Sequence, residues 1–416
     1  MRWSLLLILP IVLACNTDAT PKTKPVAAPV AAEQKVVVRD APPEEPLPPE
    51  HAAPSFRDIE AGNGHSCGVS ESADLYCWGR NDQGQVGDSG NTERTLPVAV
   101  GEGMKWRAVS AGGSHSCALT TDGEAYCWGS SVNGQLGSDT LGIVSEPYRV
   151  QKTPAFTKIS TGEDHSCAIT AEGKLYCWGE NQHGELGLSV FSKYSPAIQV
   201  APQLTWSLVS AGPHDSCGIT TDGKLYCWGL DNGGAIGVDA GDACEMDGAP
   251  EQCALPLRQP MDSQRFTAVA TGVNHSCAIN TEGVLYCWGS NDRGQLGSGF
   301  REPLAPTAVM GDARYTAVSA GRGFTCGLTK SGIVQCWGAD DDGQLAGRAA
   351  DATVPAPVAG TTKFMSLSSG LAHSCALSTD HLVYCWGSNG NGQLGTGAHK
   401  RSFQPAKLMF ADQDHP

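Results

Sequence analysis

Fourteen cysteines of this chain fall into seven pairs, and the two members of every pair are ten positions apart. In five of the seven pairs a histidine stands two residues before the first cysteine. Two chemistries use such residues: neighbouring thiols form disulfide bonds, whereas one histidine and two thiolates offer three ligands to Zn²⁺. The pairs are Cys67 and Cys77, Cys117 and Cys127, Cys167 and Cys177, Cys217 and Cys227, Cys277 and Cys287, Cys326 and Cys336, and Cys375 and Cys385.

The spacing within each pair favours disulfide bonds over a metal site. If residues 121–123 (TDG) form a three-residue hairpin loop, Cys117 lies directly opposite Cys127. Opposed residues of antiparallel strands have Cβ atoms about 4.5 to 5.5 Å apart, which is close to the disulfide distance. Before the fourth and sixth cysteine pairs, Asp215 and Phe324 stand in place of the histidine, yet both cysteine pairs are present. We therefore predict one cross-strand disulfide per pair, no metal and no other cofactor.

The histidines and tryptophans that recur with these cysteines do not form an evident catalytic set. A serine directly follows each of the five recurring histidines, so on a strand the two side chains point to opposite faces and cannot act as base and nucleophile within one unit. Recurrence at one position favours a hydrogen-bonded scaffold, and one tryptophan per unit favours packing. We predict no catalytic residue and no enzyme, with a hydrolase or lyase at the centre of the fold as the alternative. The histidines are His65, His115, His165, His275 and His373.

The cysteines belong to a longer repeat. The segment YCWG, or QCWG at Gln335, begins at seven positions separated by 50, 50, 50, 60, 49 and 49 residues. Each unit reads as three short apolar segments, a glycine loop of the form NGQLG and a fourth segment marked by proline. Segments of four to seven alternating residues between Gly, Asn and Pro are typical of strands.

Four strands in about 50 residues suit a β-propeller blade, so the sequence predicts an all-β, seven-bladed propeller. The first unit begins at Phe56 without a preceding proline-marked strand, while residues 403–409 (FQPAKLM) follow the last unit as a surplus one. We therefore expect the C-terminal strand to pair into the first blade and close the ring, which removes the open edges.

The repeat also resembles that of a known family. The pattern G-x-x-H-S-x-A-L-T-x-D-G-x-x-Y-x-W-G-x-N-x-x-G-Q-L-G is similar to the repeat of the regulator of chromosome condensation family over residues 55–410. The resemblance implies a seven-bladed propeller. It does not by itself imply the guanine-nucleotide exchange known in that family, since a fold hosts many functions. Secreted bacterial members include a proteinaceous β-lactamase inhibitor, but its contact residues cannot be transferred to this chain.

The N-terminus predicts export and a lipid anchor. Arg2 precedes an apolar run, and residues 12–15 (VLAC) resemble the lipobox of bacterial lipoproteins, in which the cysteine, here Cys15, is acylated. The expected organisation is a signal peptide at 1–14, the lipidated cysteine with a Pro/Ala-rich disordered tether at 15–54, the propeller at 55–410 and a tail at 411–416. We expect the bacterial cell envelope as the location, at the outer membrane, facing the periplasm or the exterior.

The composition narrows the choice of partners. The chain carries 28 Lys and Arg against 43 Asp and Glu, a net charge of −15, which disfavours nucleic acid and anionic lipid surfaces. Seventeen cysteines fit an oxidising compartment. We therefore expect no nucleic-acid partner, and a membrane association through the lipid anchor alone.

The fourth unit departs most from the repeat and is the predicted recognition site. It is ten residues longer than most units, and its extra segment carries five acidic residues, no basic residue, and Cys244 and Cys253, which we expect to pair. An acidic loop held by a disulfide suits a protein partner with a basic surface. The alternatives are a tolerated insertion and an envelope glycan bound by aromatic loops that include Phe300. The predicted contacts are Asp239, Asp242, Glu245, Asp247, Glu251, Phe191 and Tyr194.

Overall fold

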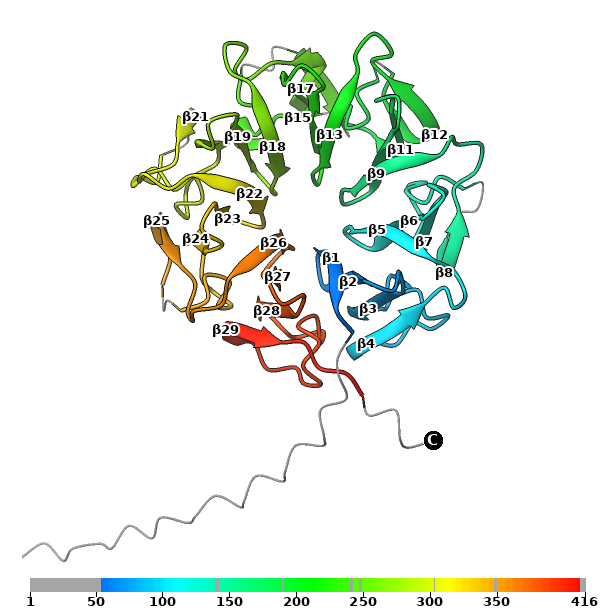
Figure 1. Cartoon of the computed structure of the whole chain (residues 1–416). Helices are drawn as coiled ribbons and strands as arrows, with labels where there is room; N and C mark the ends of the chain where they lie inside the picture. The colour runs from blue at the N-terminus through cyan, green and yellow to red at the C-terminus, as the bar shows by residue number, and fades with distance from the viewer. Residues whose placement is uncertain are drawn as a thin grey trace, which may run out of the picture. The chain divides into compact units, whose positions relative to one another are not determined.

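The computed structural model describes residues 54–138, 142–188, 190–238, 242–246, 249–302, 304–347 and 350–411. These residues form seven antiparallel sheets arranged as blades around a centre (Figure 1). Six blades have four strands and the fourth blade has five. The all-β, seven-bladed propeller is therefore confirmed. The leader, Cys15 and nearly all of the expected tether lie outside the described residues.

Each unit of the sequence makes one blade, and its first strand is the innermost. The inner strands are β1 (Phe56–Ala61), β5 (Trp106–Ala111), β9 (Phe156–Thr161), β13 (Trp206–Ala211), β18 (Phe266–Thr271), β22 (Tyr315–Ala320) and β26 (Phe364–Ser369). The second strands are β2 (His65–Ser70), β6 (His115–Thr120), β10 (His165–Thr170), β14 (Asp215–Thr220), β19 (His275–Asn280), β23 (Phe324–Thr329) and β27 (His373–Ser378).

The third strands carry the YCWG or QCWG segment and the fourth strands form the outer rim. The third strands are β3 (Leu75–Gly79), β7 (Ala125–Ser130), β11 (Leu175–Asn181), β15 (Leu225–Leu230), β20 (Leu285–Gly289), β24 (Val334–Gly338) and β28 (Val383–Gly387). The outer strands are β4 (Arg94–Val100), β8 (Ile143–Arg149), β12 (Ser192–Val200), β17 (Ala249–Arg258), β21 (Leu304–Ala308), β25 (Ala352–Pro357) and β29 (Ser402–Lys407); the fourth blade adds β16 (Asp242–Met246).

All seven predicted cross-strand disulfides are present. The register pairs Cys117 directly with Cys127, and the Cα atoms of the seven pairs are 4.0 to 4.1 Å apart. The hairpin loop has the predicted form, because Thr120 accepts from Gly123 and donates to Glu124, and Gly123 has a φ of +86°. With residues 120 and 124 as a hydrogen-bonded pair, the cysteines fall at a non-hydrogen-bonded pair, where antiparallel strands approach most closely.

The expected pairing of the C-terminal strand with the first blade is wrong. Strand β29 pairs with β28 in the seventh blade, and the first blade is completed by its own β4. The reason is that every unit ends with its own proline-marked strand, so no blade lacks one. The C-terminal segment still contacts the first blade through side chains: the Phe410 ring lies 6.2 Å from Phe56 and 5.5 Å from Tyr76, centroid to centroid.

The hydrophobic core lies between neighbouring blades. One cluster joins Val69, Leu75 and Val86 of the first blade to Trp106 and Trp128 of the second, and similar clusters occur further round the ring. The nine most voluminous fully buried side chains are all tryptophans. Among the described residues, no helix has the length and apolar character that a membrane span requires.

Candidate functional site

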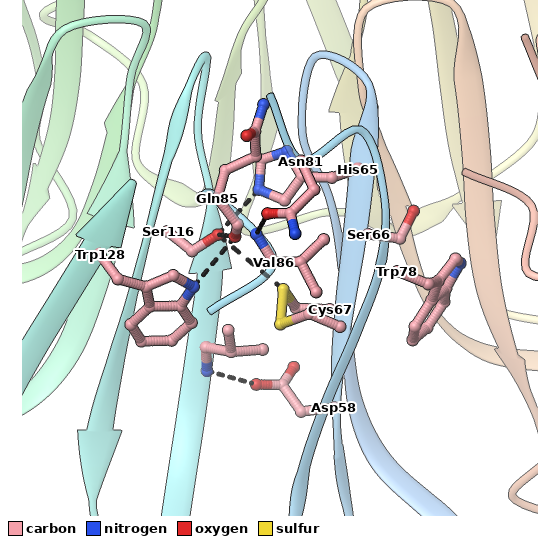
Figure 2. The surroundings of a disulfide bond; sticks show 12 residues. Asp58, His65, Ser66, Cys67, Trp78, Asn81, Gln85, Val86, Ser116 and Trp128 are labelled. Atoms are coloured by element: carbon pink, nitrogen blue, oxygen red, sulfur yellow. Dashed lines mark hydrogen bonds between the residues drawn. A yellow bond between two sulfur atoms is a disulfide. The ribbon is translucent and has the colours of Figure 1, made fainter. Parts of the chain in front are cut away.

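A hydrogen-bond network joins each blade to the next, and the repeated residues build it. At the junction of the first two blades, the Gln85 carbonyl accepts from Ser116 Oγ at 2.8 Å and from Trp128 Nε1 at 2.9 Å (Figure 2). His65 Nε2 lies 2.8 Å from Ser116 Oγ. Because the serine proton goes to the carbonyl, His65 is the donor to the serine, and its Nε2 carries the proton.

The tryptophan bond to the loop carbonyl occurs at all seven junctions, including the one between the seventh blade and the first. There Trp78 Nε1 donates to the Gln393 carbonyl at 2.8 Å, and Ser66 Oγ donates to the same oxygen at 3.0 Å. The other five acceptors are the carbonyls of Gln135, Glu185, Ala235, Gln295 and Gln344. The tryptophans therefore fix the blades to one another, as the prediction of a packing role required.

The five histidines are neutral parts of this scaffold. Burial lowers their pKa from 6.5 to about 3 for His65 and His115, where neighbouring ionisable groups add to the effect, and to about 4 for His165, His275 and His373. Four of them contact a serine of the next blade, and His275 contacts Thr325. Sequence reasoning excluded histidine–serine pairs only within a blade, and the structure forms them between blades. In each pair the histidine and its hydroxyl partner are fully buried, so they do not meet a substrate.

Two blades break this pattern at the histidine position. Phe324 fills the position with a ring and is fully buried. Asp215 is also buried, its Oδ2 has no hydrogen-bond partner, and burial raises its pKa well above the usual range. Ser276 of the next blade nevertheless donates to the Ala235 carbonyl at 3.0 Å. The backbone part of the junction therefore persists where the histidine is absent.

The extra segment of the fourth unit forms a hairpin of β16 and β17. Strand β17 pairs with β15 only from Cys253 onward, whereas its earlier residues pair with β16. The hairpin therefore extends beyond the end of β15. Asp242, Glu245 and Glu251 lie on its two strands. The structure describes only the backbone of these three residues.

The remaining predicted contacts of this segment are only partly placed. Asp239 and Asp247 lie outside the described residues. Cys253 is disulfide-bonded and fully buried. The side chain of its predicted partner, Cys244, also lies outside the description, so that pairing stays a prediction.

The two predicted aromatic contacts lie on the neighbouring third blade. Phe191 and Tyr194 are 44% and 51% exposed, beside Val190 at 74%, at the start of β12. Leu255 of β17 packs over Gly184 of the third blade, where a Cβ would lie 2.8 Å from its Cδ1. The hairpin and the exposed aromatic residues therefore belong to adjacent blades that contact each other.

The C-terminal ends of the seven inner strands, with the residues that follow them, line a central cavity of about 160 Å³. Its walls are mainly small side chains, and Glu60 supplies a carboxylate where the equivalent position in the second blade is Ser110. Ser368 donates to Glu60 Oε2 at 2.9 Å, while burial and the nearby Asp58 raise the pKa of Glu60 to about 8. Sequence reasoning missed this residue, although comparing the copies position by position reveals it.

Three further residues that sequence reasoning missed meet at the junction of the third and fourth blades. His183 and Glu185 come from the loop after β11, and His214 comes from the turn before β14. Their ligand-capable atoms all lie within 4.8 Å of one another. Comparing the seven copies position by position would have revealed these residues too, because no other copy carries ionisable metal ligands at all three equivalent positions.

Comparison with protein families identifies the repeat throughout the propeller. One model of the regulator of chromosome condensation repeat matches residues 56–85, 106–135, 156–185, 206–234, 266–295, 315–344 and 366–393. A second model of the repeat matches residues 72–119, 122–169, 222–279, 282–328 and 380–415. A search by sequence against curated proteins finds no match.

Several solved structures share the fold. Human WBSCR16 is 20% identical, with a TM-score of 0.70 over 81% of this chain and 95% of that chain. Prp20p from Saccharomyces cerevisiae, described with its binding properties to Gsp1p and histones, is 24% identical, with a TM-score of 0.64 over 76% of this chain and 81% of that chain. The ectodomain of the receptor kinase CR4 from Physcomitrella patens is 20% identical, with a TM-score of 0.50 over 81% of this chain and 75% of that chain.

Proposed function

Because the chain belongs to the regulator of chromosome condensation repeat family, we propose that it is a non-enzymatic interaction module with its recognition site at the fourth blade. The β16–β17 hairpin carries the proposal, since it adds a fifth strand, and each of the other blades has four within the described residues. Insertions into repeat proteins commonly mark the binding face. A hairpin fixed to a rigid blade also loses little conformational entropy when it binds.

The chemistry of the hairpin favours a partner with a basic surface. Residues 239–254 contain five carboxylates and no Lys or Arg. Such one-signed charge accelerates the encounter with an oppositely charged protein and disfavours acidic ones. Exposed Phe191 and Tyr194 on the adjoining blade add apolar contact area of the kind that dominates many protein interfaces.

Prp20p, which shares this fold, is described with its binding properties to Gsp1p and histones. This is an analogy of fold, and it supports a protein partner more than an enzymatic role. Exchange activity on a small GTPase is not part of the proposal, because fold alone does not transfer function. A β-lactamase is one partner class that direct inhibition assays can test.

We further propose that Cys15 is lipidated and holds the propeller at the bacterial cell envelope through the 15–54 tether. The lipobox-like residues 12–15 and the proline-rich composition support this proposal. Replacing Cys15 with serine should move the protein from the detergent phase to the aqueous phase on Triton X-114 partitioning. Unchanged partitioning of the Cys15→Ser chain would contradict the lipid anchor.

The recognition site is tested by affinity capture from the native envelope with three baits. The first is the intact chain. The second replaces residues 242–251 with two glycines and carries Cys253→Ala; the pairing of Asp242 with Cys253 keeps the joined ends close. The third keeps the hairpin but carries Asp242→Asn, Glu245→Gln and Glu251→Gln.

The expected result is a protein that the intact chain captures and both variants lose, with direct binding then measured on the purified partner. Loss from the shortened bait alone would assign recognition to hairpin shape instead of charge. Equal capture by all three baits would contradict a fourth-blade site and move recognition to another part of the propeller. Capture of polysaccharide alone would favour the glycan-binding alternative, for which the exposed aromatic residues are the candidate contacts.

A further inference from the structure

Every blade junction has three equivalent positions: the first and third residues of the glycine loop (NGQLG in the second blade) and the residue before the second strand of the next blade. At the junction of the second and third blades these are Asn133, Gln135 and Asp164. At the next junction they are His183, Glu185 and His214. The two junctions share one backbone plan, so their differences lie in the side chains.

The two sets differ in what they can bind. At the regular junction Gln135 Oε1 accepts from the Asn133 backbone at 2.9 Å, and its Nε2 donates to Asp164 Oδ1 at 2.7 Å. Glu185 Oε2 keeps the first bond, accepting from the His183 backbone at 2.7 Å. Its other oxygen has replaced the amide donor, so the side chain now offers an electron pair where the glutamine offered a proton.

The side chains around that oxygen are imidazoles: without a metal His183 Nδ1–H donates a hydrogen bond to Glu185 Oε1, and a bound metal ion would displace that proton. His183 Nδ1 lies 3.4 Å from Glu185 Oε1, and the His183 and His214 ring centroids are 4.9 Å apart. Nδ1 of His214 is buried and has no hydrogen-bond partner. Glu185 is fully buried and His183 nearly so, which holds two of the three groups in place.

We propose that His183, Glu185 and His214 bind a divalent transition-metal ion of the Zn²⁺ class and thereby link the third and fourth blades. Two imidazoles and one carboxylate form a ligand set that suits Zn²⁺ and the neighbouring first-row ions, whereas Mg²⁺ and Ca²⁺ prefer oxygen ligands alone. Three protein ligands leave a coordination position for water or for a group from a partner.

The surroundings favour a cation. Asp164 and Glu180 lie close enough to interact with Glu185, and the groups that act on these carboxylates are other carboxylates, histidines and amides. Buried carboxylates that repel one another are stabilised by a bound cation. The site also adjoins β17 just beyond the hairpin, because Gly184, which separates His183 from Glu185, packs against Leu255.

The proposal goes beyond the interaction function and is tested without any partner. The probe is Zn²⁺, titrated calorimetrically into the full chain carrying Cys15→Ser and no polyhistidine tag, with Mg²⁺ as the comparison ion. The matched variant carries His183→Asn, Glu185→Gln and His214→Asp, which copies the residues of the preceding junction. It should fold as the parent does, with the same unfolding temperature in the presence of a chelator.

The expected result is one Zn²⁺ per parent chain, no binding of Mg²⁺, and loss of this site in the triple variant. Glu185→Gln alone should weaken the affinity by more than about tenfold. The reverse exchange, Asn133→His with Gln135→Glu and Asp164→His, should create a second site and raise the stoichiometry to two. The proposal is overturned if the parent binds no Zn²⁺ or if the triple variant binds it equally well.

Discussion

The second and fourth blades have the same backbone plan but keep different parts of the repeat. The second blade has four strands, His115 bonded to Ser166 of the next blade, and Gln135 in its loop. The fourth blade has five strands, Asp215 at the histidine position and Ala235 at the glutamine position. It has therefore lost two side-chain interactions of the repeat and gained a hairpin.

What the two blades share is the bond from the next blade's tryptophan to the loop backbone. Trp178 Nε1 donates to the Gln135 carbonyl at 3.0 Å, and Trp288 Nε1 donates to the Ala235 carbonyl at 2.8 Å. A residue keeps its backbone carbonyl whatever its side chain is, so the loop residue is free to change. The comparison teaches that the ring depends on tryptophans and backbone, whereas histidine and glutamine positions can be altered for other uses.

The largest expected effect tests the shared tryptophan contact. Trp178→Ala and Trp288→Ala should each lower the free energy of unfolding by about 3 to 5 kcal/mol, because each removes a fully buried indole and leaves a cavity. The losses should be similar despite the different blades. Guanidinium unfolding with the disulfides intact measures both. A much smaller loss for Trp288→Ala would mean that the fourth blade is held differently from the second.

The next effect concerns pH and the position of Asp215. Burial lowers the pKa of His115 to about 3, so the unfolded chain binds more protons and stability falls as the pH drops below about 6.5. Burial raises the pKa of Asp215, so here the folded chain binds more protons and stability falls as the pH rises above 3.8. The two blades therefore have opposite pH dependence at one equivalent position.

Asp215→His should consequently stabilise the protein at pH 8, on the order of 1 to 2 kcal/mol, by removing a buried carboxylate and allowing a bond to Ser276. At pH 4.5 the gain should shrink or reverse, since the new histidine must stay neutral. Urea unfolding at the two pH values measures the change. Phe324→Leu, at an equivalent position with nothing to titrate, is the control and should give the same difference at both. A pH-independent gain from Asp215→His would contradict this account.

Local features of the sequence predicted most of the fold, because strands and hairpins depend on neighbours in the chain. The ten-residue spacing of Cys117 and Cys127 was sufficient to place a disulfide. Contacts between blades were not predictable in this way: the bond from His65 to Ser116 joins residues 51 positions apart. The same limit hid the His183 cluster, whose third member, His214, comes from another blade. The misplaced C-terminal strand had a different cause, a wrong choice of where each unit begins.

A smaller effect is expected from making the loop of the second blade resemble that of the fourth. Gln135→Ala removes the acceptor of the Asn133 backbone N–H and the donor to Asp164, and should cost about 1 to 2 kcal/mol. The Trp178 bond to the carbonyl of residue 135 should survive, as the native Ala235 loop indicates. Chemical denaturation and the near-ultraviolet circular dichroism of the tryptophans measure the two parts. A loss as large as that of Trp178→Ala would mean that the side chain, and not the carbonyl, holds this junction.

The smallest effect on stability is expected from the hairpin, the feature that most distinguishes the fourth blade. Replacing residues 242–251 with two glycines leaves the pairing of β17 with β15 from Cys253 to Arg258 in place. The free energy of unfolding should therefore change by only about 0.5 kcal/mol beyond the effect of Cys253→Ala, which serves as the matched control. A hairpin retained by the chain without contributing to folding is free for recognition. If its removal instead destabilised the ring as much as a tryptophan substitution, the fourth blade would need its fifth strand for closure, and a binding role would lose its main support.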